Sequence, residues 1–419
     1  MILYQHQLDI LKEDPKKVGL FLGTGSGKTS TALALCKAIR TLIICPKTQK
    51  QDNNWGREMQ RMTNADLPTP SMTLIVSKEE FRRDHEKLPP FDAVIVDEAH
   101  TCLGVLPDVR YKKKVAIPKT SQLFEALDTY LERTKPERLY LCTATIGKSP
   151  MTIWGAGKLL GKDWDFFKFR DTYYFQLPRP GRPIWVVNQD YVLKDRLADT
   201  VRKLGYVGRL QDWFDVPDQT FHTKYVELTE DQKKAMKEAT LDFPEPMTLI
   251  GKKHQIENGL LTGNEYSSEK QFKNAKIDML KEIMFEFDKV IIFAKYTAQI
   301  NQIEKELGKE VKVLVMDGRT KDKGVIINEA KNSKGKCALV VQSQISAGWE
   351  LPEFSVMVFA SMTNSYVDYV QSQGRVLRSN AIKKNLYIHL IVKGGIDEAI
   401  YRSIMNKESF NERIYAESL

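Results

Sequence analysis

A glycine-rich segment followed by lysine and threonine is the first set of residues that could do chemistry. It follows an apolar run and opens a stretch with helical spacing. Glycines let backbone N–H groups turn towards phosphate oxygens, and a helix N-terminus adds a favourable dipole. Lys28 would reach the β- and γ-phosphates of a nucleotide, and the Thr29 hydroxyl would ligate Mg²⁺. The predicted nucleotide-binding residues here are Gly23, Thr24, Gly25, Ser26, Gly27, Lys28 and Thr29. Leu22 stands where the strict pattern has Gly or Ala, and the alternative is a glycine-rich turn with an incidental lysine.

Two adjacent carboxylates, Asp97 and Glu98, follow the apolar run at residues 93–96. A parallel α/β sheet presents its functional groups at the C-terminal ends of its strands. We expect Asp97 to hold Mg²⁺ through water and Glu98 to accept a proton from an attacking water. The alternative is an acidic loop that caps the next helix, which makes no use of the strand placement.

Two arginines three residues apart, Arg375 and Arg378, suit the same reaction. A phosphoryl-transfer transition state spreads negative charge that guanidinium groups stabilise, and an arginine finger accounts for about 10³–10⁵ in rate in other phosphate-loop enzymes. If they lie on a different domain from Lys28, hydrolysis depends on domain closure. The predicted catalytic residues are therefore Lys28, Glu98, Arg375 and Arg378; the alternative for the arginines is a solvated basic helix face.

Short apolar runs that alternate with helical patterns must position these groups. Such alternation indicates βαβ units and a parallel sheet. Helical spacing covers residues 29–40 and 122–132, and residues 151–270 lack the alternation. The strand candidates form two sets: residues 18–22, 41–45, 73–76, 93–96 and 139–142, then 289–293, 311–315, 337–341, 356–359 and 386–392. The sequence predicts an α/β fold of two tandem parallel-sheet domains, 1–222 and 223–419, with a mostly helical elaboration at about 151–215.

Composition bounds the partners. The 419 residues include 63 Lys and Arg against 54 Asp and Glu, a formal net charge of +9, which favours a polyanion. Five scattered cysteines without a CxxC pair argue against a zinc site or disulfides and suit a reducing compartment. No apolar run reaches the roughly eighteen residues that span a bilayer, and no signal pattern opens the chain. We expect a cytoplasmic protein, of a bacterium or phage-infected cell, without a membrane partner.

Several segments resemble motifs of the superfamily 2 helicases. Residues 97–100, Asp-Glu-Ala-His, resemble the DEAH form of the Walker B box, and Thr143–Thr145 resembles the motif that couples hydrolysis to nucleic-acid binding. Residues 371–378 match QxxGRxxR, and residues 342–351 resemble the fifth motif. The resemblance implies two RecA-like domains that share one ATP site with Mg²⁺. It also implies that Gln5 reads the adenine, with Gln7 as a rival, and that Gly348, Glu350 and Gln371 line the site. Gly348 would allow the nucleotide or the DNA backbone to approach closely, and Glu350 would bind a ribose hydroxyl. The alternative for residues 342–351 is a turn between a strand and a helix.

Other segments resemble the Swi/Snf-type translocases. These are Ile43–Lys47 with Asn54-Trp55, the Pro150 and Trp154 extension of the third motif, and Asp317–Thr320. The family's GGxGLNL is represented only by Ala-Gly-Trp-Glu-Leu at 347–351, which leaves the contacts of the fifth motif in doubt. The compact form is similar to phage- or bacterium-encoded members, so nucleosome remodelling is not expected.

The resemblance implies a nucleic-acid track contacted mainly through phosphates, with low sequence specificity. Residues 110–114, Arg-Tyr-Lys-Lys-Lys, lie in an unusually long stretch between Asp97 and Thr143. A basic loop with an aromatic could grip a backbone or a fork; the alternative is a solvated loop. The predicted DNA contacts are Lys47, Thr48, Thr143, Thr145, Ser343, Ser346, Lys112, Lys113 and Lys114.

The sequence thus predicts an ATP-dependent translocase or helicase on duplex or branched DNA. An RNA helicase of the same fold is the nearest rival. A nucleotide-gated scaffold and the motor subunit of a larger DNA-processing complex are the others. Protein partners in replication or recombination are left open.

Overall fold

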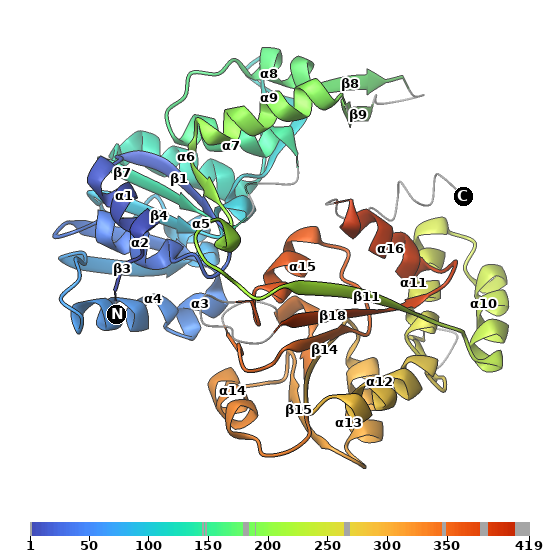
Figure 1. The fold of residues 1–419 in the computed structure, drawn as a ribbon. Helices are drawn as coiled ribbons and strands as arrows, with labels where there is room; N and C mark the ends of the chain where they lie inside the picture. Colours follow the sequence, from blue (N-terminus) through green and yellow to red (C-terminus); the bar gives the residue numbers. More distant parts are fainter. Residues whose placement is uncertain are drawn as a thin grey trace. The chain divides into compact units, whose positions relative to one another are not determined.

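The computed structural model describes residues 2–144, 146, 149–178, 184–188, 190–263, 269–345, 349–377 and 384–406. The chain forms two compact units, Met1–Phe214 and Asp215–Leu419 (Figure 1). The division falls eight residues before the expected boundary at 222. Strand β11 (Gln219–Val226) explains the difference, because it pairs with β18 (Asn385–Val392) in the second sheet.

Unit 1 is built on a six-stranded parallel sheet in the order β10-β1-β7-β4-β2-β3. The strands are β1 (Lys17–Leu22), β2 (Arg40–Cys45), β3 (Met72–Ser77), β4 (Ala93–Asp97), β7 (Arg138–Cys142) and β10 (Gly205–Gly208). All but β10 contain the predicted runs. Their side chains are largely buried because apolar layers cover both faces of the sheet, as all-parallel sheets require.

Nine helices of unit 1 lie among the described residues. They are α1 (Gln5–Glu13), α2 (Lys28–Leu35), α3 (Lys47–Gln51), α4 (Asn54–Thr63), α5 (Lys78–Asp84), α6 (Gln122–Thr134), α7 (Pro150–Leu159), α8 (Phe166–Tyr173) and α9 (Tyr191–Arg202). The predicted helix at 29–40 is too long, because α2 ends at Leu35 and Ala38 adopts a left-handed φ of 59° before β2 begins.

The segment between the two sheets is not purely helical. Besides α7, α8 and α9 it contains the antiparallel pair β8 (Tyr174–Leu177) and β9 (Ile184–Val187), and it ends with β10. Strand β10 returns to the sheet beside β1. The elaboration therefore supplies one edge of the sheet that carries the phosphate loop.

A second antiparallel hairpin replaces the loop expected at 110–114. It consists of β5 (Val105–Lys112) and β6 (Val115–Thr120), joined by Lys113 and Lys114. The expectation of a loop was wrong because both turn residues adopt left-handed φ values, 48° and 66°, which close a two-residue hairpin turn.

Unit 2 repeats the architecture with six parallel strands in the order β11-β18-β17-β14-β16-β15. The predicted strands are β14 (Lys289–Ala294), β15 (Lys312–Met316), β16 (Cys337–Gln342), β17 (Val356–Phe359) and β18; β11 was not predicted. Apolar layers cover both faces here too. The helices are α10 (Glu230–Asp242), α11 (Pro246–Glu257), α12 (Ala275–Glu286), α13 (Thr297–Leu307), α14 (Lys323–Asn332), α15 (Tyr366–Gln373) and α16 (Ile396–Met405). The two tandem parallel-sheet units confirm the predicted RecA-like α/β class.

None of the helices in the described ranges is long and apolar enough to cross a membrane.

Candidate ATP site

The loop between β1 and α2 has the backbone of a phosphate loop. Gly25 and Gly27 adopt φ values of 80° and 79°, a region that glycine enters without strain. A Cβ on Gly27 would lie 2.4 Å from Nε2 of Gln7, so the position also excludes a side chain for lack of space. The N–H of Gly23 donates to the carbonyl of Gly208 at 2.8 Å, which fixes the start of the loop to β10. Lys28 Nζ donates to the carbonyls of Leu22 and Gly23.

Gln7, rather than Gln5, contacts this loop. Gln7 is buried, accepts from the N–H of Tyr4 at 2.8 Å, and donates from Nε2 to the Gly27 carbonyl at 2.9 Å and to Thr31 Oγ1 at 3.0 Å. Gln5 is exposed and donates to Asp9. Of the two glutamines that the sequence left open, Gln7 therefore contacts the loop, because it is on the buried side of α1.

A set of stacked aromatic rings beside the loop was not predicted from the sequence. The His6 ring stacks on Trp213, with centroids 4.1 Å apart, and a ring nitrogen lies 2.9 Å from the Ser26 carbonyl. Tyr4 meets Phe214 edge-on at 4.5 Å. Some 200 residues separate the partners, so no local pattern signals the contact.

Asp97 and Glu98 lie at the carboxyl end of β4, in line with Cys142 at the end of β7. Asp97 accepts from the indole N–H of Trp55 at 3.2 Å and from the N–H of Glu98 at 2.9 Å. Burial and the adjacent Glu98 carboxylate raise the pKa of Asp97 to about 6, although Lys78 and the Trp55 hydrogen bond oppose this. The shift marks Asp97 as a carboxylate that gains from a nearby cation.

Lys78 is a second residue that the sequence did not single out. It is buried directly after β3, and its ammonium donates to the Glu98 carbonyl at 2.8 Å. Its place after a strand of the same parallel sheet was the available signal, because the carboxyl ends of parallel strands share one edge.

Two buried oxygens at this edge accept or donate no hydrogen bond among the described residues: Oε2 of Glu98 and Oγ of Ser26. A buried polar atom left unsatisfied in this way marks a site that a ligand or water completes. Oε2 of Glu98 lies 3.4 Å from Nδ1 of His100. Glu98 itself adopts a left-handed φ of 45°, an uncommon conformation for a non-glycine residue.

The residues present fit Mg²⁺ with a nucleotide. Thr29 and Asp97 offer oxygen ligands, and Mg²⁺ typically takes one or two protein oxygens while phosphate and water complete its shell. In the described ranges no group of three or more His, Cys, Asp or Glu side chains is placed to hold a metal.

His100 links the two motifs of unit 1. Its Nδ1 lies 3.0 Å from Oγ1 of Thr143, and the N–H of Thr143 donates to the Leu20 carbonyl at 3.2 Å. Thr143 is fully buried, so the structure does not support the expected DNA contact there: a backbone contact needs an exposed side chain. Thr145 lies outside the described residues.

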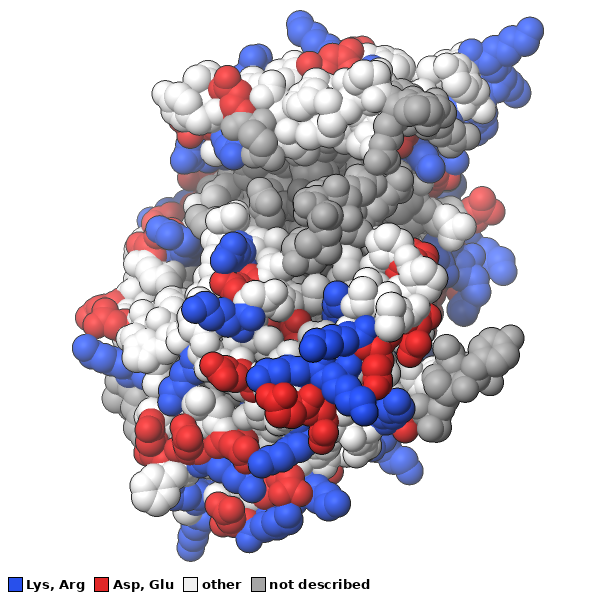
Figure 2. All heavy atoms as spheres, turned by 90° about the vertical axis from the view of Figure 1, so that its right-hand side faces the viewer, with Lys and Arg blue, Asp and Glu red and all other residues white. Residues whose placement is uncertain are grey.

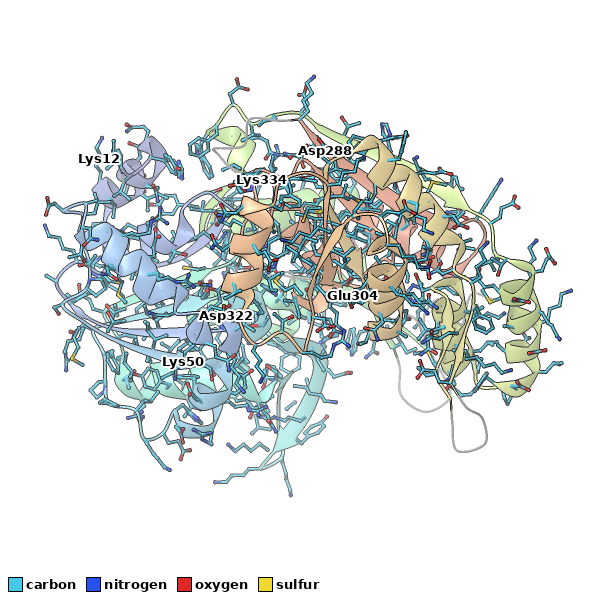
Figure 3. The ribbon with its side chains drawn as sticks, turned by 90° about the horizontal axis from the view of Figure 1, so that it is seen from below. Lys12, Lys50, Asp288, Glu304, Asp322 and Lys334 are labelled. Atoms are coloured by element: carbon cyan, nitrogen blue, oxygen red, sulfur yellow. The ribbon has the colours of Figure 1, made fainter. Side chains whose placement is uncertain are left out.

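Lys47 and Thr48, by contrast, are exposed at the start of α3. They adjoin Lys50, which is labelled in Figure 3 and pairs with Glu80 at 2.6 Å. A hollow at this surface is lined by Lys47, Lys50, Gln51, Ser77, Glu79, Glu80 and Arg83.

In unit 2, Arg375, which is expected to be catalytic, lies inside the unit. The side chain is buried and donates to the carbonyls of Gln371 at 3.0 Å and Trp349 at 2.9 Å. Its guanidinium thus ties α15 to the segment of the fifth motif. Gln371 is buried and Glu350 is exposed, so only the latter is open to a ligand from outside the unit.

The remaining expected contacts of unit 2 divide in two. Ser343 is buried, which removes the support for a DNA contact there as it does for Thr143. Ser346, Gly348 and Arg378 lie outside the described residues.

Part of the chain is similar to known proteins. Residues 275–380 match the helicase conserved C-terminal domain. A stretch of 148 residues, 33% of the chain, is 28% identical to the putative ATP-dependent RNA helicase MJ1505 of Methanocaldococcus jannaschii, and spans 19% of that protein.

Two solved structures are similar to this chain at TM-scores below 0.5. The C-terminal part of the Fun30 ATPase domain has a TM-score of 0.40 at 17% identity, over 48% of this chain and 96% of that one. The SWI2/SNF2 ATPase core of Sulfolobus solfataricus in complex with dsDNA has a TM-score of 0.39 at 16% identity, over 100% of this chain and 92% of that one. Residues 275–380 of unit 2 therefore match a helicase domain, and the phosphate loop and the Asp97–Glu98 pair lie in unit 1.

Proposed function

We propose that this chain is an ATP-dependent translocase or helicase that acts on duplex or branched DNA. The observation that carries the proposal is Oε2 of Glu98, which is buried at the sheet edge that also holds the phosphate loop and forms no hydrogen bond among the described residues. It lies 3.4 Å from Nδ1 of His100. A buried carboxylate oxygen without a hydrogen bond is costly in free energy, and it remains available as a base.

The chemistry follows from the residues at that edge. Lys28, Thr29 and Asp97 would hold the triphosphate and Mg²⁺, which neutralises charge on the phosphates. Water attacks the γ-phosphorus, the bond to the β–γ bridging oxygen breaks, and Glu98 takes the proton from the water. ADP and phosphate are the products. Arg378 is the candidate for the arginine finger, and Arg375 positions its segment through its bonds to two carbonyls.

A link from this chemistry to nucleic acid is supported by His100. It stands 3.4 Å from Glu98 and 3.0 Å from Thr143, so a change at the hydrolysis site reaches the end of β7 through one side chain. Lys47 and Thr48 offer exposed phosphate contacts. The chain has a formal net charge of +9. On the face shown in Figure 2, however, basic and acidic side chains of the described residues are interleaved and form no purely basic patch. Backbone contacts of this kind predict low sequence specificity.

DNA as the track rests on the Swi/Snf-like motifs. RNA is the second candidate, because the relative that matches a third of the chain carries the name of an RNA helicase. A scaffold with vestigial hydrolysis is disfavoured by the retained Glu98 and Lys28. A motor subunit of a larger complex would hydrolyse ATP only with its partner present.

Steady-state ATP hydrolysis tests the proposal. The protein is assayed alone and with single-stranded, duplex or forked DNA, or with RNA of matched sequence. The variants are Glu98→Gln and, as control, Glu132→Gln, an exposed carboxylate on α6. We expect duplex or forked DNA to raise the rate at least about tenfold, an effect lost in Glu98→Gln and kept in the control.

Other outcomes overturn the proposal in distinguishable ways. Stimulation by RNA alone establishes the RNA helicase. If ATP binds but no nucleic acid stimulates its hydrolysis, the result favours a nucleotide-gated scaffold or a motor subunit whose partner is missing. Full activity of Glu98→Gln would remove the assigned base.

A further inference from the structure

The β5–β6 hairpin is firmly anchored at its base. Val105 is buried in the core of unit 1, and it packs so closely on α7 that a Cβ on Gly155 would lie 2.9 Å from its Cγ2. Glu125 of α6 accepts from both strands: from Arg110 at 2.8 Å and from Thr120 at 2.8 Å. Arg110, part of the run singled out in the sequence, is therefore a structural residue of the hairpin.

The tip, by contrast, extends away from the core. Val109 is the outermost hairpin residue on β5 that packs against the core. At about 3.3 Å per residue, Lys113 lies roughly 13 Å beyond it, which is about four base-pair steps. Figure 3 shows the hairpin, in pale cyan, projecting from the edge of the ribbon.

The tip carries an exposed aromatic ring among three lysines. Tyr111 is 75% exposed, and Lys112, Lys113 and Lys114 are exposed as well. Tyr111 is opposite Ala116, and Lys112 is opposite Val115, so ring and lysine lie on opposite faces of the hairpin. Within the described part of the chain, no carboxylate forms an ion pair with these three lysines.

The residues of the turn are not the ones that would stabilise it most. Both turn positions are left-handed, and Asn-Gly or Asp-Gly is the combination that favours this turn. A lysine in the left-handed region costs free energy that glycine does not. Strain of this kind is typical of functional positions, and here it places two ammonium groups at the end of the projection.

We propose that the hairpin recognises a junction between single- and double-stranded nucleic acid. The lysines bind phosphates of the strands, and Tyr111 stacks on the base face that a junction exposes. A ring beside an intact duplex backbone finds no open base face, whereas at a junction or in a single strand each stacked base contributes to affinity. The inference rests on the proposed function and narrows its substrate to forked or branched molecules.

Fluorescence anisotropy with a labelled fork and a blunt duplex of the same sequence tests the inference. The variant is Tyr111→Ala; Tyr191→Ala on α9, where the tyrosine is 73% exposed, is the matched control, and Tyr111→Phe retains the ring. We expect the wild type and the control to prefer the fork. Tyr111→Ala should weaken fork binding about 5- to 100-fold and leave duplex binding unchanged, and Tyr111→Phe should restore fork binding.

The lysines are tested by salt dependence. Lys112, Lys113 and Lys114 changed together to Gln should weaken both substrates and lower the slope of log K against log salt by about 2–3. The control changes Lys233, Lys234 and Lys237, exposed on α10, to Gln, which removes the same charge.

Failure of this inference is distinct from failure of the proposed function. If the wild type binds fork and duplex equally, or if Tyr111→Ala keeps the preference, the junction role is overturned, although DNA-stimulated hydrolysis can still stand. If the hairpin variants keep their nucleic-acid affinity and salt slope, the tip has another partner. If no nucleic acid binds or stimulates the wild type, both proposals fail.

Discussion

Replacing Lys276 with methionine should destabilise unit 2 by about 3–5 kcal/mol. Lys276 is 1% exposed, and its ammonium lies 2.6 Å from Oδ2 of Asp397. It also donates to Asn258 Oδ1 at 2.9 Å and to the Ala360 carbonyl at 2.7 Å, so all three protons have acceptors. The side chain thereby joins α12 to α16 and to the end of β17.

The magnitude comes from the carboxylate that is left behind. Burial alone would raise the pKa of Asp397, but Lys276 and His254 outweigh it and lower the pKa to about 2. Without Lys276 the buried charge keeps only His254, 3.1 Å from Oδ1. The Lys233–Glu230 pair, at 2.8 Å, is exposed, so solvent screens it and Lys233→Met serves as the control.

Native-state hydrogen exchange along a urea gradient measures the effect, with the full chain throughout. Peptides of α12 and α16 report unit 2, and peptides of unit 1 serve as the internal reference, which avoids assuming that a two-unit chain unfolds in one step. Opening of unit 2 should become about 10²–10³ times more populated in Lys276→Met. Adding Asp397→Asn should recover part of the loss, because the unpaired charge is gone. A cost no larger than that of Lys233→Met would refute the reasoning.

Two further predictions concern the nucleotide and pH. Gln7→Ala should weaken ATP binding about tenfold, because it removes hydrogen bonds to the phosphate loop. Gln5→Ala should change ATP binding less than about twofold. Titration with the nucleotide measures both affinities, and equal effects of the two changes would contradict the assignment of Gln7. Burial and the nearby Asp397 raise the pKa of Glu257 to about 8. A carboxyl with a raised folded pKa favours the fold in its protonated form, so unit 2 should lose stability as pH rises from about 4.5 to 8, by at most about 1.4 kcal/mol per pH unit. Exchange measured across this range should show a slope that Glu257→Gln flattens; an unchanged slope would contradict the cause.

The elements that could be predicted are those whose own residues carry the pattern. Strands β1 and β4 are short apolar runs between polar residues, and burial on both faces of a sheet leaves that mark in any sequence. Strand β10, Gly-Tyr-Val-Gly, has no such run. It is held by pairing with β1, where a Cβ on Gly205 would lie 1.9 Å from the Gly19 carbonyl. A strand selected by close approach to a distant neighbour cannot be found from its own composition.

The candidate site shows the same division between residue type and placement. The phosphate loop and Asp97–Glu98 were identified because spacing alone determines their chemistry. The direction of the Arg375 side chain could not be predicted, since a QxxGRxxR pattern does not say whether a guanidinium faces solvent or its own backbone. The hairpin turn was missed because Lys-Lys lacks the Asn-Gly signal that announces such a turn.

The hydrolysis site and the hairpin share their supporting elements. Glu98 directly follows β4, the 3-10 turn at Ala99–Cys102 carries His100, and β5 begins three residues after that turn. On the other side, Thr143 meets His100, and α7, which follows seven residues later, packs against β5 at the base of the hairpin. Close-packed interiors transmit small displacements rather than absorb them. A movement of His100 would therefore act on the 3-10 turn at Ala99–Cys102, which leads into β5. Because the tip lies roughly 13 Å beyond the core, a small rotation at the base of the hairpin would give a larger displacement of the tip. We therefore expect the position of the tip to depend on the bound nucleotide.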